Sequence, residues 1–269
     1  MEAARKPLPM PAVRPLILMP SYNTGRILRD TVAGVLTAEC PLWVIIDGST
    51  DGSRELLREF GSGDHPDFRV LELTKNSGKG AALLHGLREA VKCGFTHVLT
   101  MDADGQHPAA RIPEFLRLSA AHPEAAVFGK PVFDDSAPAI RVNGRKVSNF
   151  WANLETLWWG IGDSLFGMRV YPAGILLEVM RFTPFARRFD FEPEIAVMLC
   201  WLGVPVINLP TPVRYPGKDE GGVSQFRYLR DNTLLTWMHF RLLICFLILL
   251  PWLLIRGRNP LRHIRPEPS

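Results

Sequence analysis

The segment DADGQHP, at residues 102–108, carries the residue types best suited to chemistry in this chain of 269 residues. It follows the apolar run His97 to Met101, which has the composition of a β-strand. Side chains two positions apart at the end of a strand point to the same side, so Asp102 and Asp104 can converge on one cation, with Gln106 adding a neutral oxygen. Such oxygen ligands suit Mg²⁺ or Mn²⁺ shared with phosphate groups.

Two earlier polar segments also follow apolar runs. In PSYN, Pro20 gives a rigid turn, Tyr22 an aromatic face and Asn23 an amide, where a nucleobase could stack. In DGSTDGS, Asp47 can accept hydrogen bonds from a base or a ribose, and the glycines permit turn conformations. The structural alternatives are a packing role for the tyrosine and a plain capped turn for DGSTDGS.

A third segment, NSGKGAAL, places Asn76 and Lys79 before a helical pattern. The amides at the start of that helix could hold a phosphate, with the lysine adding charge. The spacing is not that of a Walker loop, and a lysine in a glycine-rich turn is often simply solvated. The candidate cofactor-contacting residues are therefore Pro20, Tyr22, Asn23, Asp47, Asn76, Lys79 and Asp102.

The elements that must position these segments alternate in type along the first half of the chain. Strands are expected at Leu16 to Met19, Leu42 to Ile46, Arg69 to Leu73, His97 to Met101 and Ala125 to Phe128. Helices are expected at Thr24 to Thr37, Ser53 to Phe60, Gly80 to Lys92 and Ala110 to Ala121. This order predicts an α/β fold, with a Rossmann-like, mostly parallel sheet flanked by helices. Its ligand crevice would lie beyond the carboxyl ends of the strands, where the polar segments fall.

The second half has a looser pattern. Helices are expected at Lys146 to Trp159 and Glu194 to Leu202, and a strand at Val204 to Leu209. Near the end, Leu242 to Ile255 contains no polar residue, but as a helix it would be only about 21 Å long, against about 30 Å of bilayer hydrocarbon. Arginines follow at once, which favours a helix lying in a membrane interface. A full span and a buried core or oligomer helix are the alternatives.

The overall composition narrows the class of protein. A formal net charge of +4 and a pI of about 9.0 suit a nucleotide, a lipid phosphate or an anionic membrane, whereas no pattern typical of nucleic-acid binding is present. The four cysteines are scattered, as expected in a reducing compartment. The only apolar run near the start, Leu16 to Met19, is too short for a signal peptide, so we expect a cytoplasmic catalytic part.

In this order and at these intervals, PxYN, DGSTDGS, NxGKGxA and DADGQHP resemble the family 2 glycosyltransferases with the GT-A fold. Within that family the chain looks most like the dolichol-phosphate mannosyltransferase group, over roughly Pro15 to Phe226. The resemblance implies a nucleotide-sugar donor and a lipid or polyprenyl-phosphate acceptor. It also implies a divalent metal held by Asp102, Asp104 and Gln106.

The later segments match the family more loosely. GDSLFGMR is similar to a segment ending in GFR, which implies that Arg169 faces a phosphate. GGVSQF, at residues 221–226, resembles a stretch that closes over the site. The chain departs from the family at Ile46, where many members have a second Asp, and at Gln225, which replaces a common Lys. The other departures are Thr24, in place of an acidic residue, and the added length at Lys218 to Glu220, which leaves a role for Arg214 open.

The resemblance also implies inversion at the anomeric carbon, so a hydroxyl acceptor would need a carboxylate base. Glu192, in FDFEPEI, is the first candidate and Glu194 the second, with Asp163 and Asp190 as further alternatives. Both glutamates could instead merely complement the start of a helix. A lipid-phosphate acceptor is already anionic and would need no base, in which case Arg169 would matter more.

The expected function is that of a metal-dependent glycosyltransferase at the cytoplasmic side of the inner (plasma) membrane, peripheral or monotopic. The alternatives are a nucleotidyltransferase that makes nucleotide sugars and a non-catalytic, membrane-docked nucleotide-sugar binder. The expected organisation is a flexible start (1–14), a catalytic domain (15–230) and a membrane-associating tail (231–269). The catalytic domain would consist of a donor half (15–130) and an acceptor half (131–230).

Overall fold

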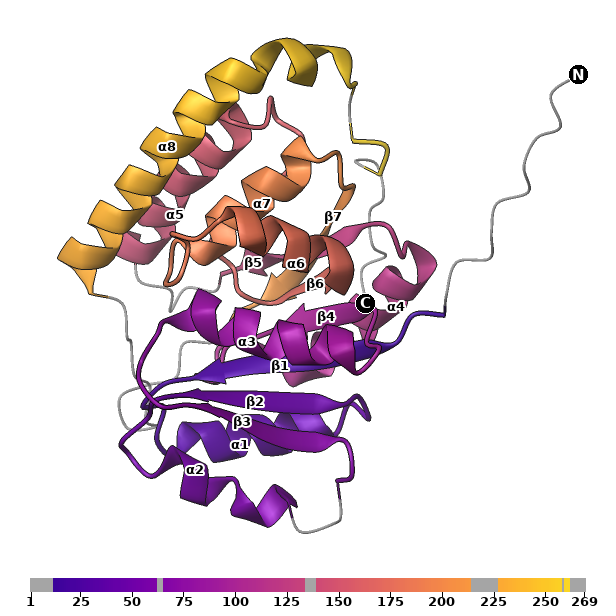
Figure 1. The fold of residues 1–269 in the computed structure, drawn as a ribbon, viewed down its shortest axis with the longest axis vertical. Helices are drawn as coiled ribbons and strands as arrows, with labels where there is room; N and C mark the ends of the chain where they lie inside the picture. Colours follow the sequence, from indigo (N-terminus) through magenta and orange to yellow (C-terminus); the bar gives the residue numbers. More distant parts are fainter. Residues whose placement is uncertain (1–11, 62–64, 134–138, 214–226, 258, 262–269) are drawn as a thin grey trace, which may run out of the picture.

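The computed structural model describes residues 12–61, 65–133, 139–213, 227–257 and 259–261. These residues form a seven-stranded sheet in the order β3-β2-β1-β4-β6-β5-β7 (Figure 1). The strands are β1 (Pro15–Ser21), β2 (Leu42–Asp47), β3 (Phe68–Leu73), β4 (His97–Thr100), β5 (Ala126–Val132), β6 (Arg169–Pro172) and β7 (Val206–Pro212). β6 runs antiparallel to β4 and β5, whereas the other pairings are parallel. The prediction of a mostly parallel sheet is confirmed.

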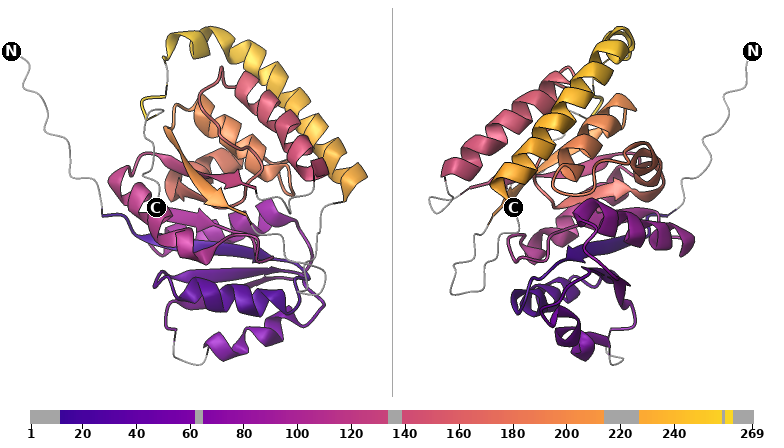
Figure 2. Two further views of the ribbon diagram at one scale, coloured as in Figure 1. Left: turned by 180° about the vertical axis from the view of Figure 1, so that it is seen from behind. Right: turned by 60° about the vertical axis from the view of Figure 1, so that its left-hand side comes forward.

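Helices cover both faces of this sheet (Figures 1 and 2). They are α1 (Ile27–Leu36), α2 (Ser53–Leu56), α3 (Lys79–Lys92), α4 (Ile112–Ala121), α5 (Ala139–Leu154), α6 (Ala173–Phe182), α7 (Phe191–Trp201) and α8 (Tyr228–Ile255), with 3₁₀ turns η1 (Arg58–Gly61) and η2 (Ala109–Arg111). Alternate residues of β1 face opposite cores: Leu16 and Leu18 pack with α3, α6 and α7, and Ile17 and Met19 pack with α1 and α4. Burial on both faces explains the continuous apolar runs in the sequence.

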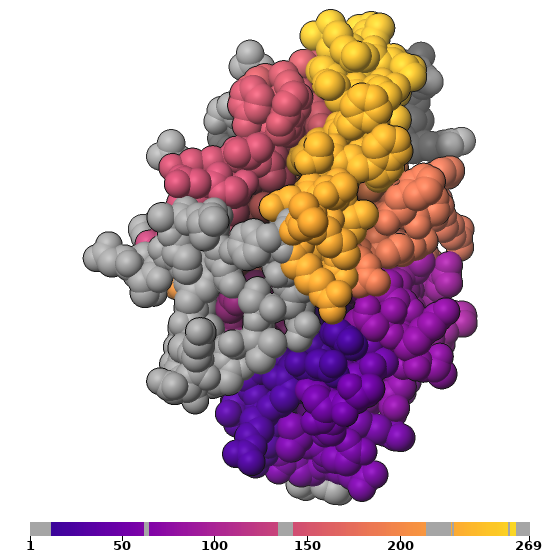
Figure 3. All heavy atoms as spheres, turned by 90° about the vertical axis from the view of Figure 1, so that its left-hand side faces the viewer, coloured from indigo at the N-terminus to yellow at the C-terminus, as the bar shows by residue number. Residues whose placement is uncertain are grey.

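Helix α8 lies beside α5 on the outside of the second half of the molecule (Figure 3). One side of α8 joins the main core through Met238, Leu242, Phe246 and Leu253. Its other side exposes large apolar residues: Trp237, Phe240, Ile244, Leu247, Ile248, Trp252, Leu254 and Ile255. Among the described residues, α8 is the one helix long and apolar enough to cross a membrane by length and composition.

The structure differs from the sequence-based expectations mainly in the second half. It contains β6 and α6, which the sequence pattern did not indicate. The helix expected to reach Trp159 ends at Leu154, because Leu157 and Trp158 have positive φ angles of 51° and 53°, which an α-helix does not allow. In the first half, the helix expected from Ser53 to Phe60 is divided into α2 and η1.

The carboxyl-terminal helix also differs from expectation. It begins at Tyr228 and has 28 residues, so its first half, which contains the polar residues, precedes the apolar run Leu242 to Ile255. The expected domain boundary between residues 230 and 231 falls inside its first turn. Because its buried side belongs to the main core, α8 is packed onto the rest of the fold along much of its length.

Candidate active site

The tips of β1, β2 and β4, together with the turn after β3, open into one cavity of about 620 Å³. The parallel register aligns these tips, since Ser21 lies opposite Ile46 and Asp47 opposite Leu73. The cavity lining includes Pro20, Tyr22, Asn23, Asp47, Asn76, Lys79, Asp102, Asp104, Gln106 and Glu192. The structure therefore brings together the candidate site residues except Arg169, Glu194 and the alternative acids Asp163 and Asp190.

The two aspartates after β4 form the acidic part of the cavity. The backbone N–H of Asp102 donates to His107 Nδ1 at 3.0 Å, and the backbone N–H of Gln106 donates to Asp104 Oδ1 at 3.1 Å. Burial and the neighbouring charge of Asp102 raise the pKa of Asp104 to about 7. Two carboxylates that repel each other in this way fit a divalent cation, which would relieve the repulsion.

The described residues include no group of three or more His, Cys, Asp or Glu side chains that could hold a metal. An ion held by Asp102 and Asp104 would therefore take further ligands from a neutral oxygen such as that of Gln106, from water or from a phosphate. This is the kind of incomplete protein site that Mg²⁺ and Mn²⁺ use when they bind a phosphorylated substrate.

Lys79, the first residue of α3, connects two acids of the cavity. Its Nζ lies 2.5 Å from Asp102 Oδ1 and also pairs with Glu192. Burial disfavours the charged ammonium, but the two carboxylates outweigh it and raise the pKa of Lys79. The pKa of Asp102 is lowered in turn, because Lys79 overcomes the opposing effect of burial. The lysine is therefore cationic and lies in the cavity between the two acids.

Asp47 holds the turn between β3 and α3. Its Oδ1 accepts the N–H of Ser77 at 2.7 Å, and its Oδ2 accepts that of Gly78 at 2.8 Å. The same turn presses on Gly48, which has φ +65° and where a Cβ would lie 2.4 Å from the carbonyl carbon of Lys75. Asp47 thus fixes the loop that leads into α3 while its carboxylate lines the cavity.

Asn23 joins the tips of β1 and β2. Its side-chain Oδ1 accepts the N–H of Thr50 at 2.8 Å, and its own N–H donates to Ser49 Oγ at 3.0 Å. Asn23 has φ 46°, a conformation that asparagine tolerates better than most residues. This arrangement sets the turn that carries Tyr22 at the cavity wall.

Arg169 does not lie where the sequence resemblance placed it. It stands on β6 with no exposed surface. Its guanidinium donates to the carbonyls of Glu192 at 2.9 Å and Asp163 at 3.1 Å, and it stacks 4.4 Å from the ring centre of Phe128. Because its guanidinium donates to these carbonyls, Arg169 positions the beginning of α7. Its side chain does not line the cavity, so it is not placed to contact a phosphate there.

The remaining acid candidates are also engaged. Glu194 accepts two hydrogen bonds from Arg241 of α8, at 3.1 and 3.0 Å, and is not part of the cavity lining. Asp163 and Asp190, which likewise do not line the cavity, accept from Arg145 at 2.7 Å and from the N–H of Arg188 at 3.0 Å. Glu192 is the one of these four that reaches the cavity, and burial raises its pKa.

A basic part of the cavity was not predicted from the sequence. Arg145, Arg188, Arg227 and Arg230 line it, from α5, the loop before α7, and the beginning of α8. Arg145 is oriented by its ion pair with Asp163. Because these arginines lie in three separate segments without a shared motif, spacing alone gave no signal of them.

Two uncharged positions support the acidic part and were also missed. A Cβ at Gly167 would lie 2.6 Å from Asp102 Oδ2 and 2.8 Å from Lys79 Nζ, so only glycine leaves room for this ion pair. His107 is buried, which lowers its pKa to about 4, so the neutral ring accepts from the Asp102 backbone. Gly167 and His107 lie in the GDSLFGMR and DADGQHP segments, which the sequence analysis singled out. Their roles were missed because they depend on contacts between residues that are distant in the sequence.

Some expectations concern residues outside the described part of the chain. These are the proposed closing stretch at residues 221–226, with Gln225, and the extra loop length at Lys218 to Glu220 with Arg214.

A mostly parallel sheet, with acidic and amide side chains at the strand tips around one cavity, is typical of α/β proteins that bind their ligand beyond the carboxyl ends of the strands. The sequence profile described as "Glycosyl transferase family 2" matches residues 16–190. The chain therefore belongs to glycosyl transferase family 2 and is a glycosyltransferase with the GT-A fold.

Named relatives agree with this family. The chain is 26% identical over 206 residues to a polyprenol monophosphomannose synthase of Mycolicibacterium smegmatis, covering 74% of this chain and 77% of the relative. It is 24% identical over 212 residues to an undecaprenyl-phosphate mannosyltransferase of Micrococcus luteus, covering 74% and 82%.

Solved structures share the fold. The mannosyltransferase PcManGT of Pyrobaculum calidifontis, in complex with GDP-Man and Mn²⁺, superposes with a TM-score of 0.60 at 20% identity. The match covers 95% of this chain and 70% of that one.

Proposed function

We propose that this protein is an inverting, divalent-metal-dependent glycosyltransferase that moves a sugar from a nucleotide diphosphate donor to a polyprenyl phosphate. One observation carries the proposal: a single cavity has an acidic part that fits a metal-bound diphosphate and a basic part that fits a second, anionic substrate. The names of the relatives, which refer to polyprenol and undecaprenyl phosphate, support this choice of acceptor.

On the donor side, Asp102, Asp104 and Gln106 would hold Mg²⁺ or Mn²⁺, which supplies charge neutralisation for the departing nucleoside diphosphate. Lys79 would stand beside the diphosphate as a second positive charge. The base and ribose would lie against Pro20, Tyr22 and Asp47, at the tips of β1 and β2.

On the acceptor side, Arg145 and Arg230 would bind the phosphate. The ion pair with Asp163, with 2.7 Å between Nη1 and Oδ1, already orders the side chain of Arg145. Little conformational entropy of that side chain would therefore be lost when the phosphate binds. A phosphate oxygen of the acceptor would attack the anomeric carbon, and the bond from that carbon to the diphosphate oxygen would break, with its electrons leaving on the diphosphate.

Such an acceptor already carries an ionised phosphate oxygen that can attack without losing a proton, so the reaction needs no general base. We propose that Glu192 then acts through Lys79, whose ammonium it holds in the cavity. A hydroxyl acceptor would instead require Glu192 as the base, because it is the only one of the four acid candidates that lines the cavity.

We further propose that the exposed apolar side of α8 lies in the interface of the cytoplasmic leaflet. A helix of 28 residues is about 42 Å long. Because one side of it is packed against the catalytic fold, crossing the bilayer would require it to separate from that core. Lying flat, it would bury Trp237, Ile244 and Ile248 in lipid and leave the cavity open to acceptors in the same leaflet.

The reaction is tested by incubating the purified full-length chain with nucleotide sugars, beginning with GDP-mannose, and Mn²⁺, with and without undecaprenyl phosphate in detergent. The expected result is nucleoside diphosphate release that depends on the acceptor, together with a glycosylated lipid. Pyrophosphate formed from a nucleoside triphosphate and a sugar phosphate would instead indicate a nucleotidyltransferase. Donor binding with neither reaction would indicate a non-catalytic binder.

A further inference from the structure

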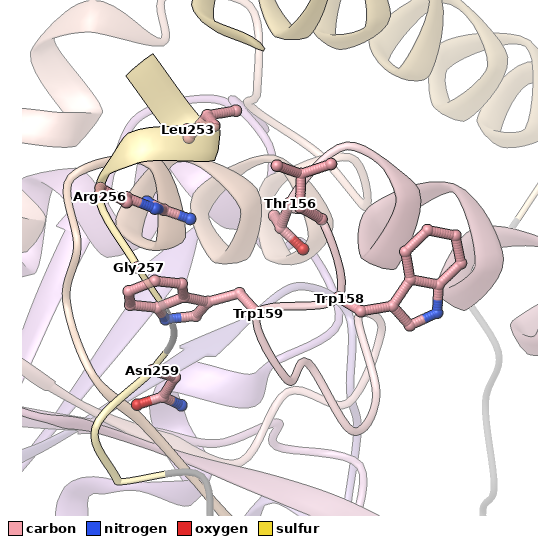
Figure 4. A pocket seen from close by; sticks show the side chains of 8 residues that line it. Thr156, Trp158, Trp159, Leu253, Arg256, Gly257 and Asn259 are labelled. Atoms are coloured by element: carbon pink, nitrogen blue, oxygen red, sulfur yellow. The ribbon is translucent and has the colours of Figure 1, made fainter. Parts of the chain in front are cut away.

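A second pocket, of about 340 Å³ (Figure 4), is lined by the end of α8, whereas the catalytic cavity is lined by the beginning of that helix. The turn that follows α5 forms one wall through Thr156, Trp158 and Trp159, and the end of α8 forms the other through Leu253 and Arg256. None of the residues that line this pocket lines the catalytic cavity. It is therefore a separate site.

Arg256 supplies a cation that has no acidic partner among the described residues. Its guanidinium stacks 3.9 Å from the ring centre of Trp159, and its Nη1 donates to the Cys200 carbonyl. Within the described residues it forms no ion pair, and its Nε is buried without a hydrogen-bond partner. Burial lowers the pKa of Arg256, as expected for a guanidinium without a nearby carboxylate. Apart from the bond to Cys200, its terminal N–H groups donate to none of the described residues, so they can donate to an oxygen-rich anion.

The opposite wall is shaped by an unusual turn. Leu157 and Trp158 both have positive φ, at 51° and 53°, which costs energy for residues with bulky side chains. The turn directs the indole of Trp159 toward Arg256 and that of Trp158 outward, away from Arg256, where the residue is 50% exposed (Figure 4). An exposed indole can contact the glycerol and acyl region of a lipid while its N–H donates to a polar head group.

The surroundings of the pocket are apolar and face outward. Trp252, Leu254 and Ile255, in the last turn of α8, are 49%, 67% and 84% exposed. A free phosphate gains nothing from such neighbours, whereas a phospholipid places acyl chains beside its phosphate. The arrangement of an arginine, tryptophans and exposed aliphatic side chains is the one that proteins use at the head-group level of a bilayer.

We propose that this pocket binds the phosphodiester head group of a membrane glycerophospholipid, with Arg256 contacting the phosphate and Trp158 contacting the lipid body. The carbonyl end of a helix disfavours anions, so binding there depends on the arginine. Since Arg227 and Arg230 line the catalytic cavity at the other end of α8, a bound lipid at Arg256 would hold both ends of the helix at the same depth in one leaflet. The proposal does not require the catalytic assignment to be correct.

The test uses a lipid that stays monomeric, so that membrane docking by α8 does not enter. Dihexanoylphosphatidylglycerol, below its micelle-forming concentration, and inorganic phosphate are each titrated into the full-length protein by calorimetry. We expect the lipid to bind at least about 10-fold more tightly than phosphate, because only the lipid offers apolar contact area. We expect Arg256→Gln to weaken lipid binding at least about 10-fold, the usual effect of losing a hydrogen bond to a charged group.

Control variants separate this site from other parts of the protein. Arg117→Gln, an exposed arginine on α4, should leave lipid affinity unchanged. Arg145→Gln, in the catalytic cavity, should also leave it unchanged, so a failed catalytic assignment cannot imitate a failed lipid site. Trp158→Ala should weaken the binding of the lipid but not that of inorganic phosphate, and it should leave the melting temperature unaltered. If Arg256→Gln does not fold, Trp158→Ala takes its place in the test.

Three results would overturn the proposal. They are the absence of lipid binding, lipid binding that neither Arg256→Gln nor Trp158→Ala weakens, and inorganic phosphate that binds as tightly as the lipid and is weakened by Arg256→Gln but not by Arg145→Gln. The last would identify a phosphate site instead of a lipid site.

Discussion

Lys79 and Asp102 form an ion pair in the catalytic cavity, with 2.5 Å between Nζ and Oδ1. The same ammonium pairs with Glu192, so one lysine joins the loop after β4 to the beginning of α7. In the proposed reaction a cation held by Asp102 and Asp104 would take over part of this neutralisation, leaving Lys79 able to contact the donor diphosphate. The pair thus connects donor binding to the geometry of the whole site.

Replacing Lys79 by methionine should lower both turnover and stability. Turnover should fall at least about 100-fold, as when a charge-stabilising donor is removed from an active site. The melting temperature should also fall, because leaving a buried charge unpaired costs about 3–5 kcal/mol. Lys75→Met, in the same turn but exposed and outside the cavity, is the matched control and should leave both unchanged. Near-native turnover in Lys79→Met would remove the lysine from the mechanism.

Gly167→Ala tests the space beside the ion pair. The added methyl would meet Asp102 Oδ2 at 2.6 Å and Lys79 Nζ at 2.8 Å, which are side-chain atoms that can move, so the fold should survive while the site shifts. We expect at least about a 10-fold weaker Mn²⁺ activation and an unchanged melting temperature, since altering the groups that support metal ligands typically costs about 10–100-fold. Gly174→Ala, where a Cβ meets nothing within 4 Å, is the control. Equal Mn²⁺ activation in the two variants would contradict this role for Gly167.

Arg145→Gln should separate acceptor binding from donor binding. Losing a charge-assisted contact worth about 1.5–3 kcal/mol should raise the KM for polyprenyl phosphate at least about 10-fold. The Kd for the donor, measured without acceptor, should not change. Lys146→Gln, the exposed neighbour on α5, should behave as the wild type. A weakened donor Kd in Arg145→Gln would place this arginine on the donor side instead.

The contact between Glu155 and α8 should make stability depend on pH. Glu155 has no exposed surface and lies 3.0 Å from His239 Nδ1, and burial raises its pKa above the ordinary 4.5. The folded state then binds more protons than the unfolded state as the pH rises above that value, so the free energy of unfolding should fall with rising pH. In Glu155→Gln, the contribution of this carboxyl group to the pH dependence should be absent. The contribution is measured as the difference between the free energies of unfolding of the wild type and the variant at each pH.

Glu178→Gln, on the exposed side of α6, serves as the control for that comparison and should follow the wild-type profile. If the wild type gains stability relative to Glu155→Gln over the same pH interval, the direction assigned to Glu155 is wrong.

The first half of the chain could be read from the sequence because its candidate site residues lie in local segments. Each strand there is an apolar run followed by its own polar turn, and parallel strands bring successive turns to one edge. Asp102 and Asp104 are neighbours in the chain as well as in space, so their pairing required no knowledge of the fold.

The second half could not be read in the same way, because its important contacts join distant residues. Strand β6 has four residues and passes directly into α6 without a turn, so neither element was evident. Arg169 has carbonyl groups as partners, which leave no trace in a sequence, and the partner of Glu194 is Arg241, 47 positions away. The basic side of the cavity is likewise assembled from separate helices and loops.

The most direct test of the account compares sugar transfer to undecaprenyl phosphate by the wild type and by Asp104→Asn, with Mn²⁺ and after its removal by EDTA. Asp30→Asn, an exposed aspartate on α1, controls for the substitution. We predict that EDTA abolishes transfer and added Mn²⁺ restores it. Asp104→Asn should lose more than about 100-fold in turnover, because even groups that only support metal ligands contribute about 10–100-fold, and its melting temperature should not fall. Transfer that persists in EDTA and is undiminished in Asp104→Asn would contradict the assignment of these carboxylates to a metal and its diphosphate.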